Sequence, residues 1–432
     1  KDKIMIEPKF AMIPSAVKRV GTPSNAKVYS LLPSDGSGDL FAGNDGFTQM
    51  ARYNKDLLIE FGDKPRLDWY AKKTCPTLLL EGQRTNLMLW SEDFTANVWV
   101  NSGYTVTSNN GISPDGNKTA NLLRSTTSTL PQGISQDVSR GTFNTTYENF
   151  SIFVKRAEEF PLNNLVYFQA TTIYGAEITL TWDFDNKTLV SNTPTVSILD
   201  EASFKELPNG WFRIEARFTM GSSYQTAWKI STVPFGSVYV WGGQFEFSGT
   251  SSSNQQEVMP SSYIKTTFNA STRAKDFCRS GSVTPEIFDN SSGTLFVDLE
   301  SVLENSTNTT SKTIGISNGS SVEDRVFIST ATSGLTSFTL IRSQYVSQTS
   351  TTTIDRSFRN KMAISWDSNS VRTYVNGVVV FSGSNFYGTP IGLNSFKFAA
   401  ATFQGEFFGE IGDVRYYDSL LSDADLIELT TI

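Results

Sequence analysis

The sequence predicts an all-β protein built from two tandem β-sandwiches. Only 18% of its 432 residues are charged and 12% are aromatic, while Ser, Thr, Asn and Gly are abundant. Short runs that alternate apolar with polar residues recur between turn-forming residues, and long amphipathic helical patterns are hard to find. The length suffices for two or three domains, each with its own core.

Two short segments precede the first predicted sandwich. Residues 1–24 crowd apolar side chains into a stretch too short for its own core, which indicates a docking arm that packs on this chain or on a partner. Residues 25–90 are rich in turns, with strands predicted at 28–32 and 57–61. We expect this loop-rich β segment to pack on the sandwich that follows.

The first sandwich is predicted over residues 91–280. Its candidate strands cover residues 151–155, 165–170, 176–183, 211–220, 227–231 and 237–247. Many of them alternate apolar with polar residues, as a strand with one buried face does. Trp211 and Trp241 are expected in the core, because large aromatic side chains dominate the cores of sandwiches. Simple alternation puts Trp241 and Glu246 out of phase on their strand.

The second sandwich is predicted over residues 281–432. Asn376-Gly377 stands between β-forming residues and indicates a two-residue hairpin turn. Near the end of the chain, Ser422 followed by Asp425 predicts the N-cap of a short helix.

The stretch at residues 78–90, LLLEGQRTNLMLW, places Arg84 and Asn86 between two apolar runs. Both polar side chains are therefore expected to be at least partly buried. A buried guanidinium needs carboxylate or carbonyl partners, so we interpret Arg84 as a structural clamp. The alternative is an arginine that binds an anion or a sugar.

This stretch, with SEDF and Trp99 after it, belongs to a series of motifs in fixed order. The others are KVYSLLP (27–33), DGSGD (35–39), PRLD (65–68), CP (75–76), NGWFR (209–213), VWGGQFE (240–246), SYI (262–264) and TRAKD (272–276). Over residues 25–278 the chain resembles bacteriophage virion proteins of the tail-fibre and head-fibre kind. The motif residues that we expect to form a fold-holding network are Arg84, Asn86, Trp241, Glu246, Arg273 and Asp276.

The resemblance implies a carbohydrate-binding-module-like jelly roll for the first sandwich. The last strand and helix, with the Asn-Gly hairpin, resemble the closing elements of laminin-G or concanavalin-A-like lectin domains. A structural protein of the virion surface is implied, assembled in the bacterial host cytoplasm and attached to host glycan by multivalent binding. The implied partners are other virion proteins, contacted through the N-terminal segment, and further copies of the chain, for which we expect a trimer.

The composition excludes several classes of function. The chain has no histidine, which removes Ser-His-Asp and Cys-His catalytic centres and the usual zinc sites. Thirty-six basic and 43 acidic residues give a net charge of -7, and no basic cluster indicates nucleic-acid binding. No run of ~20 apolar residues indicates membrane insertion. Cys75 and Cys278 are expected to lie near each other and to be reduced.

No catalytic site or required cofactor is expected. Asp298-Leu299-Glu300 and Asp183-Phe184-Asp185 are the nearest carboxylate patterns, and neither has the spacing typical of glycosidases with a concanavalin-A-like fold. Asp298, Asn318 and Asp324 could supply oxygen ligands to Ca²⁺, but no spacing motif selects them over exposed loop residues.

Three functions remain open at this stage. The first and favoured one is host-glycan attachment by a virion protein. The second is a capsid decoration protein that braces its neighbours without binding a receptor, and the third is a polysaccharide-degrading enzyme. Exposed aromatic residues such as Tyr345, Phe386 and Tyr387 could stack on sugar rings or pack in a subunit interface.

Overall fold

A computed structural model describes the chain in two compact units. The described residues are 8, 10–12, 27–29, 51–61, 66–70, 76–128, 132–139, 146–157, 164–172, 177–192, 198–220, 225–250, 259–276, 288, 291–302, 312–318, 324–331, 333–343, 345–384, 387–398 and 407–432. Unit 1 comprises Lys1–Gly46, Asp63–Gly82 and Lys275–Ile432, and unit 2 comprises Phe47–Gly62 and Gln83–Ala274. Strands dominate both units, so the prediction of an all-β protein with sandwiches is confirmed.

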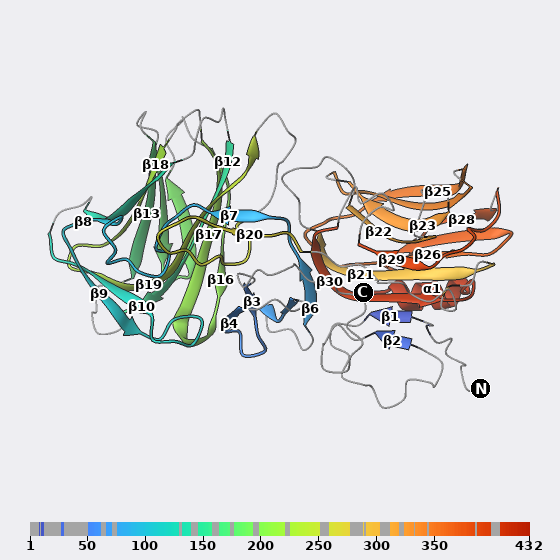
Figure 1. The fold of residues 1–432 in the computed structure, drawn as a ribbon, viewed down its shortest axis with the longest axis horizontal. Coiled ribbons are helices and arrows are strands. Elements are labelled where there is room, and N and C mark those ends of the chain that lie inside the picture. The colour runs from blue at the N-terminus through green and yellow to red at the C-terminus, as the bar shows by residue number, and fades with distance from the viewer. Residues whose placement is uncertain are drawn as a thin grey trace. The chain divides into compact units, whose positions relative to one another are not determined.

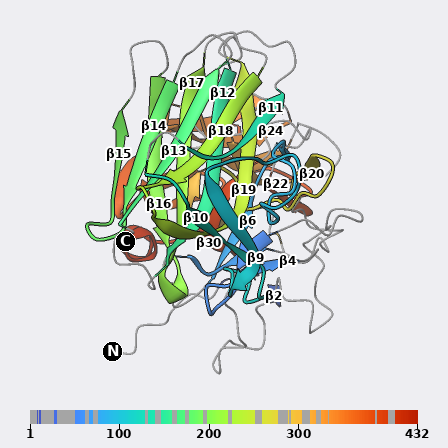
Figure 2. The ribbon, with the colours of Figure 1, turned by 90° about the vertical axis from the view of Figure 1, so that its left-hand side faces the viewer.

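Unit 2 is a β-sandwich (Figures 1 and 2). Its described strands are β3 (Ala51–Tyr53), β4 (Ile59–Phe61), β7 (Arg84–Asn86), β8 (Val100–Ser102), β9 (Tyr104–Gly111), β10 (Ala120–Ser125), β11 (Gly133–Ser139), β12 (Thr146–Arg156), β13 (Leu165–Thr172), β14 (Glu177–Asp183), β15 (Thr188–Asn192), β16 (Ile198–Glu206), β17 (Trp211–Met220), β18 (Gln225–Thr232), β19 (Ser237–Thr250) and β20 (Ser271–Arg273). One sheet has the order β16-β17-β12-β19-β10-β9 and the other β15-β14-β13-β18-β11-β8, with antiparallel pairing in both. Apolar side chains fill the space between them, with Phe150 stacked on Trp228 at 4.2 Å between ring centroids.

In the middle of strand β19, the alternation of side chains between the two faces of the sheet shifts by one residue. Trp241 pairs with Phe153 and Gln244 pairs with Ser151, so Gly242 and Gly243 together stand opposite one residue of β12. Gly242 has a φ of 63°, and a Cβ there would lie 2.9 Å from the Phe153 ring. This β-bulge brings Trp241 and Glu246 to the same face, the one turned away from the core between the sheets. The prediction from simple alternation is therefore wrong, although Trp211 and Trp241 are both buried as expected.

Unit 1 is a second sandwich, with one helix (Figure 1). Its described elements are β1 (Phe10–Met12), β2 (Lys27–Tyr29), β5 (Leu67–Asp68), β6 (Thr77–Leu80), β21 (Gly293–Val302), β22 (Lys312–Ser317), β23 (Arg325–Thr330), β24 (Leu335–Arg342), β25 (Tyr345–Thr353), β26 (Asn360–Trp366), β27 (Ser370–Val375), β28 (Val378–Ser384), β29 (Ser395–Lys397), β30 (Gly409–Tyr417) and α1 (Asp423–Thr430). One sheet follows the path β2-β1-β30-β21-β26-β27-β28, with β6 and β5 added beside β30, and the other has the order β25-β24-β23-β22-β29. The main core lies between these sheets, and α1 covers the outer face of the larger one through Leu426, packed with Phe296 and Tyr374.

Two local predictions for this unit are confirmed. Asn376 and Gly377 have φ values of 51° and 80°, the left-handed conformation that a two-residue hairpin turn requires. Ser422 caps α1, because its Oγ accepts a hydrogen bond from the Asp425 N–H at 3.2 Å.

The loop-rich segment differs from the prediction, whereas the described part of the docking arm packs on this chain, one of the two expected places. Residues 25–90 are divided between the units: β4 lies in unit 2, where the Ile59 N–H donates to the Pro114 carbonyl, whereas β6 pairs with β30 of unit 1. All four residues of β6 are buried, so this apolar strand needs cover on both faces, which a place within the large sheet supplies. Strand β1 of the predicted docking arm also pairs with β30, so its described part binds the chain's own sheet. The rest of the arm, Cys75 and Cys278 lie outside the described residues. No helix in the described ranges is long and apolar enough to span a membrane.

Candidate functional site

Asn86 makes four hydrogen bonds that link three of the motifs. Its side chain is fully buried, and its Nδ2 donates to the Gly243 and Ile264 carbonyls at 3.1 and 2.8 Å. Its Oδ1 accepts from the N–H groups of Met88 and Phe245, both at 3.0 Å. The amide thus uses its full capacity of two donors and two acceptor sites. It joins the motif around residue 86 to those at 240–246 and 262–264.

Arg84 and Arg273 face each other across the two-stranded sheet β7–β20 and are 4% and 0% exposed. Two like charges in this position destabilise a sheet unless a counter-charge is near. Buried Glu246 supplies it, and this carboxylate also accepts hydrogen bonds from the Ser261 N–H (3.0 Å) and Oγ (2.5 Å). Burial raises the pKa of Glu246, although Arg84, Ser261 and Arg273 act to lower it.

Asp276, the sixth predicted member, lies in a buried cluster of unit 1. Arg66 Nη1 binds Glu81 Oε2 at 2.6 Å, and its Nη2 binds Asp276 Oδ2. The Glu81 N–H also donates to Asp276 Oδ2 at 2.7 Å. Burial lowers the pKa of Arg66, but the charges of Asp276 and Glu81 outweigh it and raise the pKa above its usual value. Sequence reasoning missed Arg66 as a member, although it stands in the PRLD motif.

Of the six predicted residues, five lie in unit 2 and Asp276 lies in unit 1. All six are buried, at 4% exposure or less. Their partners are backbone groups and buried charges, an arrangement that suits a structural clamp and leaves little surface for a ligand. The structural role remains our interpretation of these residues.

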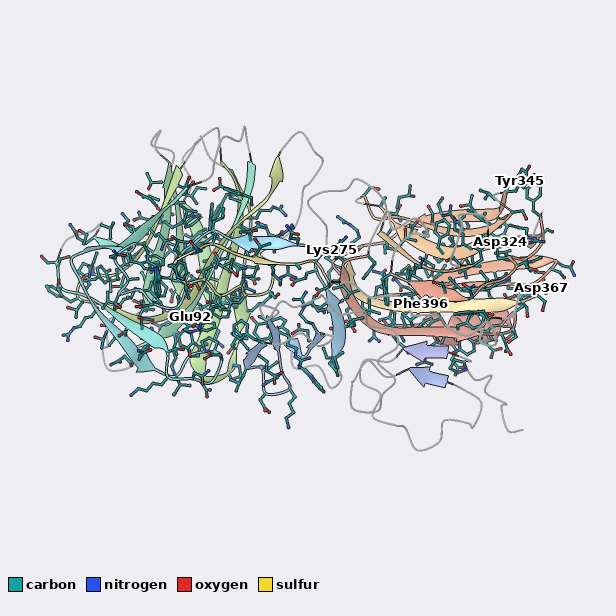
Figure 3. All side chains as sticks on the ribbon, viewed as in Figure 1. Glu92, Lys275, Asp324, Tyr345, Asp367 and Phe396 are labelled. Carbon is teal, nitrogen blue, oxygen red and sulfur yellow. The ribbon has the colours of Figure 1, made fainter. Side chains whose placement is uncertain are left out.

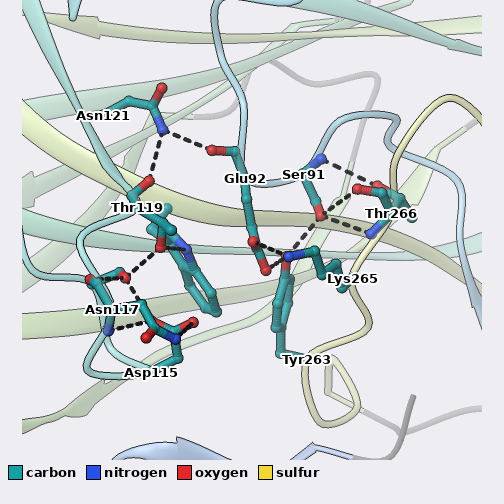
Figure 4. Close-up of polar contacts among 11 residues, drawn as sticks. Ser91, Glu92, Asp115, Asn117, Thr119, Asn121, Tyr263, Lys265 and Thr266 are labelled. Carbon is teal, nitrogen blue, oxygen red and sulfur yellow. Dashed lines mark hydrogen bonds and ion pairs between the residues drawn. The ribbon is translucent and has the colours of Figure 1, made fainter. Parts of the chain in front are cut away.

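A second polar cluster in unit 2 lies around Glu92 (Figure 4). Tyr263 Oη donates to Glu92 Oε1 at 3.2 Å and lies 2.7 Å from Ser91 Oγ, while Lys265 Nζ binds Glu92 Oε2 at 2.6 Å. The Tyr263 ring packs against Trp241, with 4.6 Å between centroids. Burial raises the pKa of Glu92, although Lys265 and Tyr263 act to lower it. The cluster is a polar extension of the core, since Ser91 and Tyr263 are buried.

We expect Glu92→Gln to weaken the pH dependence of stability. Because the pKa of Glu92 is higher in the folded than in the unfolded chain, its contribution favours folding at low pH and is lost as pH rises through the folded pKa. The variant keeps an oxygen for Tyr263 but does not titrate. Urea unfolding of unit 2 at a series of pH values from about 4 to 8 measures this. The free energy of unfolding should fall less steeply with pH in the variant, and equal slopes would contradict the assignment.

The carboxylates considered for Ca²⁺ or catalysis lie beside arginines. Asp298 accepts from Arg359 Nε and Nη2 at 2.9 and 2.6 Å, and Asp324 accepts from Arg342 Nη1 at 3.1 Å. Both are buried, not exposed loop residues. Within the described part of the chain, no group of three or more His, Cys, Asp or Glu residues could hold a metal ion. Asp183 instead caps a turn, where its Oδ1 accepts from the Asp185 N–H at 2.8 Å.

Tyr345 and Tyr387 form an exposed aromatic pair in unit 1 (Figure 3 labels Tyr345). Tyr345 begins β25 and Tyr387 lies in the loop before β29, yet their rings stack with centroids 5.6 Å apart and planes 29° apart. The two residues remain 61% and 59% exposed. Sequence reasoning named both but could not place them together, because they are distant in the chain. Phe386 lies outside the described residues.

A partly buried ion pair adjoins this aromatic pair. Arg342 is the cross-strand neighbour of Tyr345, which places their side chains on one face, and it donates to Asp324 Oδ1. The Ile391 N–H donates to the same oxygen at 2.9 Å, which ties the loop of Tyr387 to β23 and β24. We call Tyr345, Tyr387, Asp324, Arg342 and Ile391 the tyrosine site. It offers two flat apolar faces beside a polar group, which is the combination that orients an amphipathic ligand.

Comparison with known proteins identifies the fold around this site. Residues 301–426 match the family described as the concanavalin A-like lectin/glucanases superfamily. No curated protein sequence matches the chain.

Several solved structures are similar to part of the chain. The CBM40 domain of Ruminococcus gnavus IT-sialidase, bound to α2,3-sialyllactose, is 17% identical over 35% of this chain and 92% of its own, with a TM-score of 0.30. The leech intramolecular trans-sialidase is 19% identical over 35% of this chain and 26% of its own, with a TM-score of 0.30. The SAP-like pentraxin of Limulus polyphemus is 13% identical over 32% and 68%, with a TM-score of 0.25. No functional conclusion follows from likeness at this level. The family match, in contrast, confirms the prediction for the C-terminal sandwich, which is a concanavalin-A-like domain.

Proposed function

We propose that this chain is a structural protein of a bacteriophage virion surface that binds host glycan through its C-terminal sandwich. The observation that carries glycan binding is the exposed tyrosine pair on a concanavalin-A-like domain. A sugar ring can cover such aromatic surface with its apolar C–H face. Removing this apolar surface from water favours binding. The Arg342–Asp324 pair is tied to both tyrosines, because Arg342 is the cross-strand neighbour of Tyr345 and Asp324 accepts from the loop of Tyr387, and it would meet the hydroxyl groups of the sugar.

The virion part of the proposal is supported by the ordered motifs over residues 25–278. In the structure, Arg84, Asn86 and Glu246 of these motifs are buried, as expected for residues that define a fold and not a ligand. We further propose assembly in the host cytoplasm, attachment to other virion proteins through the N-terminal segment, and a trimer. Several weak sites on one virion would then act together and raise the avidity.

We propose that the chain acts by binding and not by catalysis. A glycosidase of this fold needs two carboxylates free to exchange protons and attack the sugar. In the larger sheet of unit 1, Asp298 and Asp413 face each other on β21 and β30, but Arg359 and Arg415 each bind one of them. Each of these two carboxylates is thus engaged in an ion pair instead of being open to a sugar.

The double variant Tyr345→Ala/Tyr387→Ala should lose glycan binding. Each aromatic contact contributes about 0.5–1.5 kcal/mol, so loss of two corresponds to roughly 5- to 150-fold in Kd. The full chain is applied to an array of bacterial surface glycans, and the Kd of each retained glycan is measured for the wild type and the variant.

Phe358→Ala is the matched control, because Phe358 is a 68% exposed aromatic residue elsewhere in the same unit. It should leave the Kd unchanged. Equal binding by the wild type and the double variant would refute the site. Failure of the full chain to bind any glycan, together with attachment to purified virions, would favour a decoration protein.

A further inference from the structure

The tyrosine site contains one positive and one negative charge, and they are paired with each other. Arg342 Nη1 donates to Asp324 Oδ1, and Asp324 is only 7% exposed. The next cation along the chain, Arg325, points to the opposite face of its strand and lies over the Phe327 ring at 5.1 Å. Residues 319–323, 344 and 385–386, which adjoin these residues in the sequence, include no Lys or Arg. None of the five residues that define the tyrosine site therefore supplies an uncompensated cation to attract an acidic sugar.

The remaining polar atoms of the pair decide what the site can bind. Within the described part of the chain, Asp324 Oδ2 accepts no hydrogen bond, and Arg342 Nε and Nη2 donate none. The ion pair thus offers a ligand one acceptor, Asp324 Oδ2, and the N–H donors on Nε and Nη2 of Arg342. A hydroxyl group both donates and accepts, so two neighbouring hydroxyls can satisfy Asp324 and Arg342 together. A carboxylate only accepts, so it leaves Asp324 Oδ2 unpaired and adds a like charge beside it.

We infer that the tyrosine site takes a neutral glycan, with neighbouring hydroxyl groups on the Asp324–Arg342 pair and a sugar face on the tyrosines. The inference rests on the proposed function, since it names the class of glycan for the same site. An acidic glycan, with a sialic or uronic acid at the contact, is selected against by Asp324. This is specificity through an unfavourable charge contact as well as through favourable hydrogen bonds.

The test compares neutral glycans with their acidic counterparts on the full chain. Lactose is paired with 3′-sialyllactose, and each neutral glycan found on the array is paired with its form containing a uronic acid. Within each pair that binds, we expect the neutral member to bind at least about tenfold more tightly. Tighter binding of the acidic member would overturn the inference and leave glycan binding intact. Absence of binding to every glycan would overturn the proposed function itself, so the two failures are distinguishable.

Two variants test the role of the charge pair. Asp324→Asn keeps an oxygen for Arg342 and Ile391 but leaves the guanidinium charge uncompensated, so the preference should shift towards the acidic member by about tenfold or more. Arg342→Gln removes the cation and should retain the preference for the neutral member. An unchanged ratio of the two Kd values in Asp324→Asn would overturn the assignment. If that variant does not fold, the ratios of the wild type and of Arg342→Gln still decide the question.

Discussion

Arg66→Ala should lower the free energy of unfolding of unit 1 by about 3–5 kcal/mol. The side chain of Arg66 is 1% exposed, and it is the cation between Glu81 and Asp276, whose side chains are 9% and 1% exposed. Without it, two buried carboxylates would lose the cation that they share, and removing one partner of a buried ion pair is among the costliest single changes in a protein. Scanning calorimetry of the full chain measures the transition of unit 1.

Arg156→Ala is the control for this experiment. Arg156 also binds a carboxylate, Asp185 at 2.5 Å, but the two side chains are 36% and 50% exposed. Exposed ion pairs contribute about 0–1 kcal/mol, so the control should change stability little. Equal small effects of both substitutions would show that the Arg66 cluster does not stabilise the unit.

Asn86→Ala should destabilise unit 2 by about 4 kcal/mol. The substitution leaves two carbonyls and two N–H groups, from Gly243, Ile264, Met88 and Phe245, without the partner that Asn86 supplies. Each buried polar group left unpaired costs about 1–3 kcal/mol, and water that enters the new cavity offsets part of the sum. Urea unfolding monitored by tryptophan fluorescence follows mainly unit 2, because Trp182, Trp211, Trp228 and Trp241 are buried in it, whereas Trp366 is the buried tryptophan in the described part of unit 1.

The matched control is Asn110→Ala. Asn110 is exposed and accepts one hydrogen bond, from Tyr239 Oη at 3.2 Å. Its removal should change stability by no more than about 0.5 kcal/mol. A loss at Asn86 as small as that at Asn110 would contradict the role we assign to the motif.

The sequence predicts well those features that depend on residues close to one another in the chain. The hairpin turn at Asn376-Gly377 and the helix cap at Ser422 follow from backbone conformation and a local hydrogen bond, and both are observed. The burial of Arg84 and Asn86 follows from the apolar runs on either side.

Features that depend on distant partners could not be predicted in the same way. Strand β6 gives no local sign that its partner is β30, more than 300 residues away. The bulge at Gly242 and Gly243, where Gly242 approaches the Phe153 ring, shifts the alternation of side chains in β19 by one residue. Simple alternation therefore puts Glu246 and Trp241 on opposite faces, whereas they lie on the same one. The pairing of Tyr345 with Tyr387 is likewise a product of the fold, so no local pattern could single out the tyrosine site.

In this chain we assign the motif residues to holding the fold and the tyrosine site to binding glycan. Hydrogen exchange of the full chain, with and without a saturating neutral oligosaccharide, tests both halves at once. We predict slower exchange on binding at residues 342–346 and 387–393, and unchanged exchange at residues 84–92 and 262–273. Protection of the segment around Arg84 without protection around Tyr345 and Tyr387 would contradict the account and favour a sugar-binding role for Arg84.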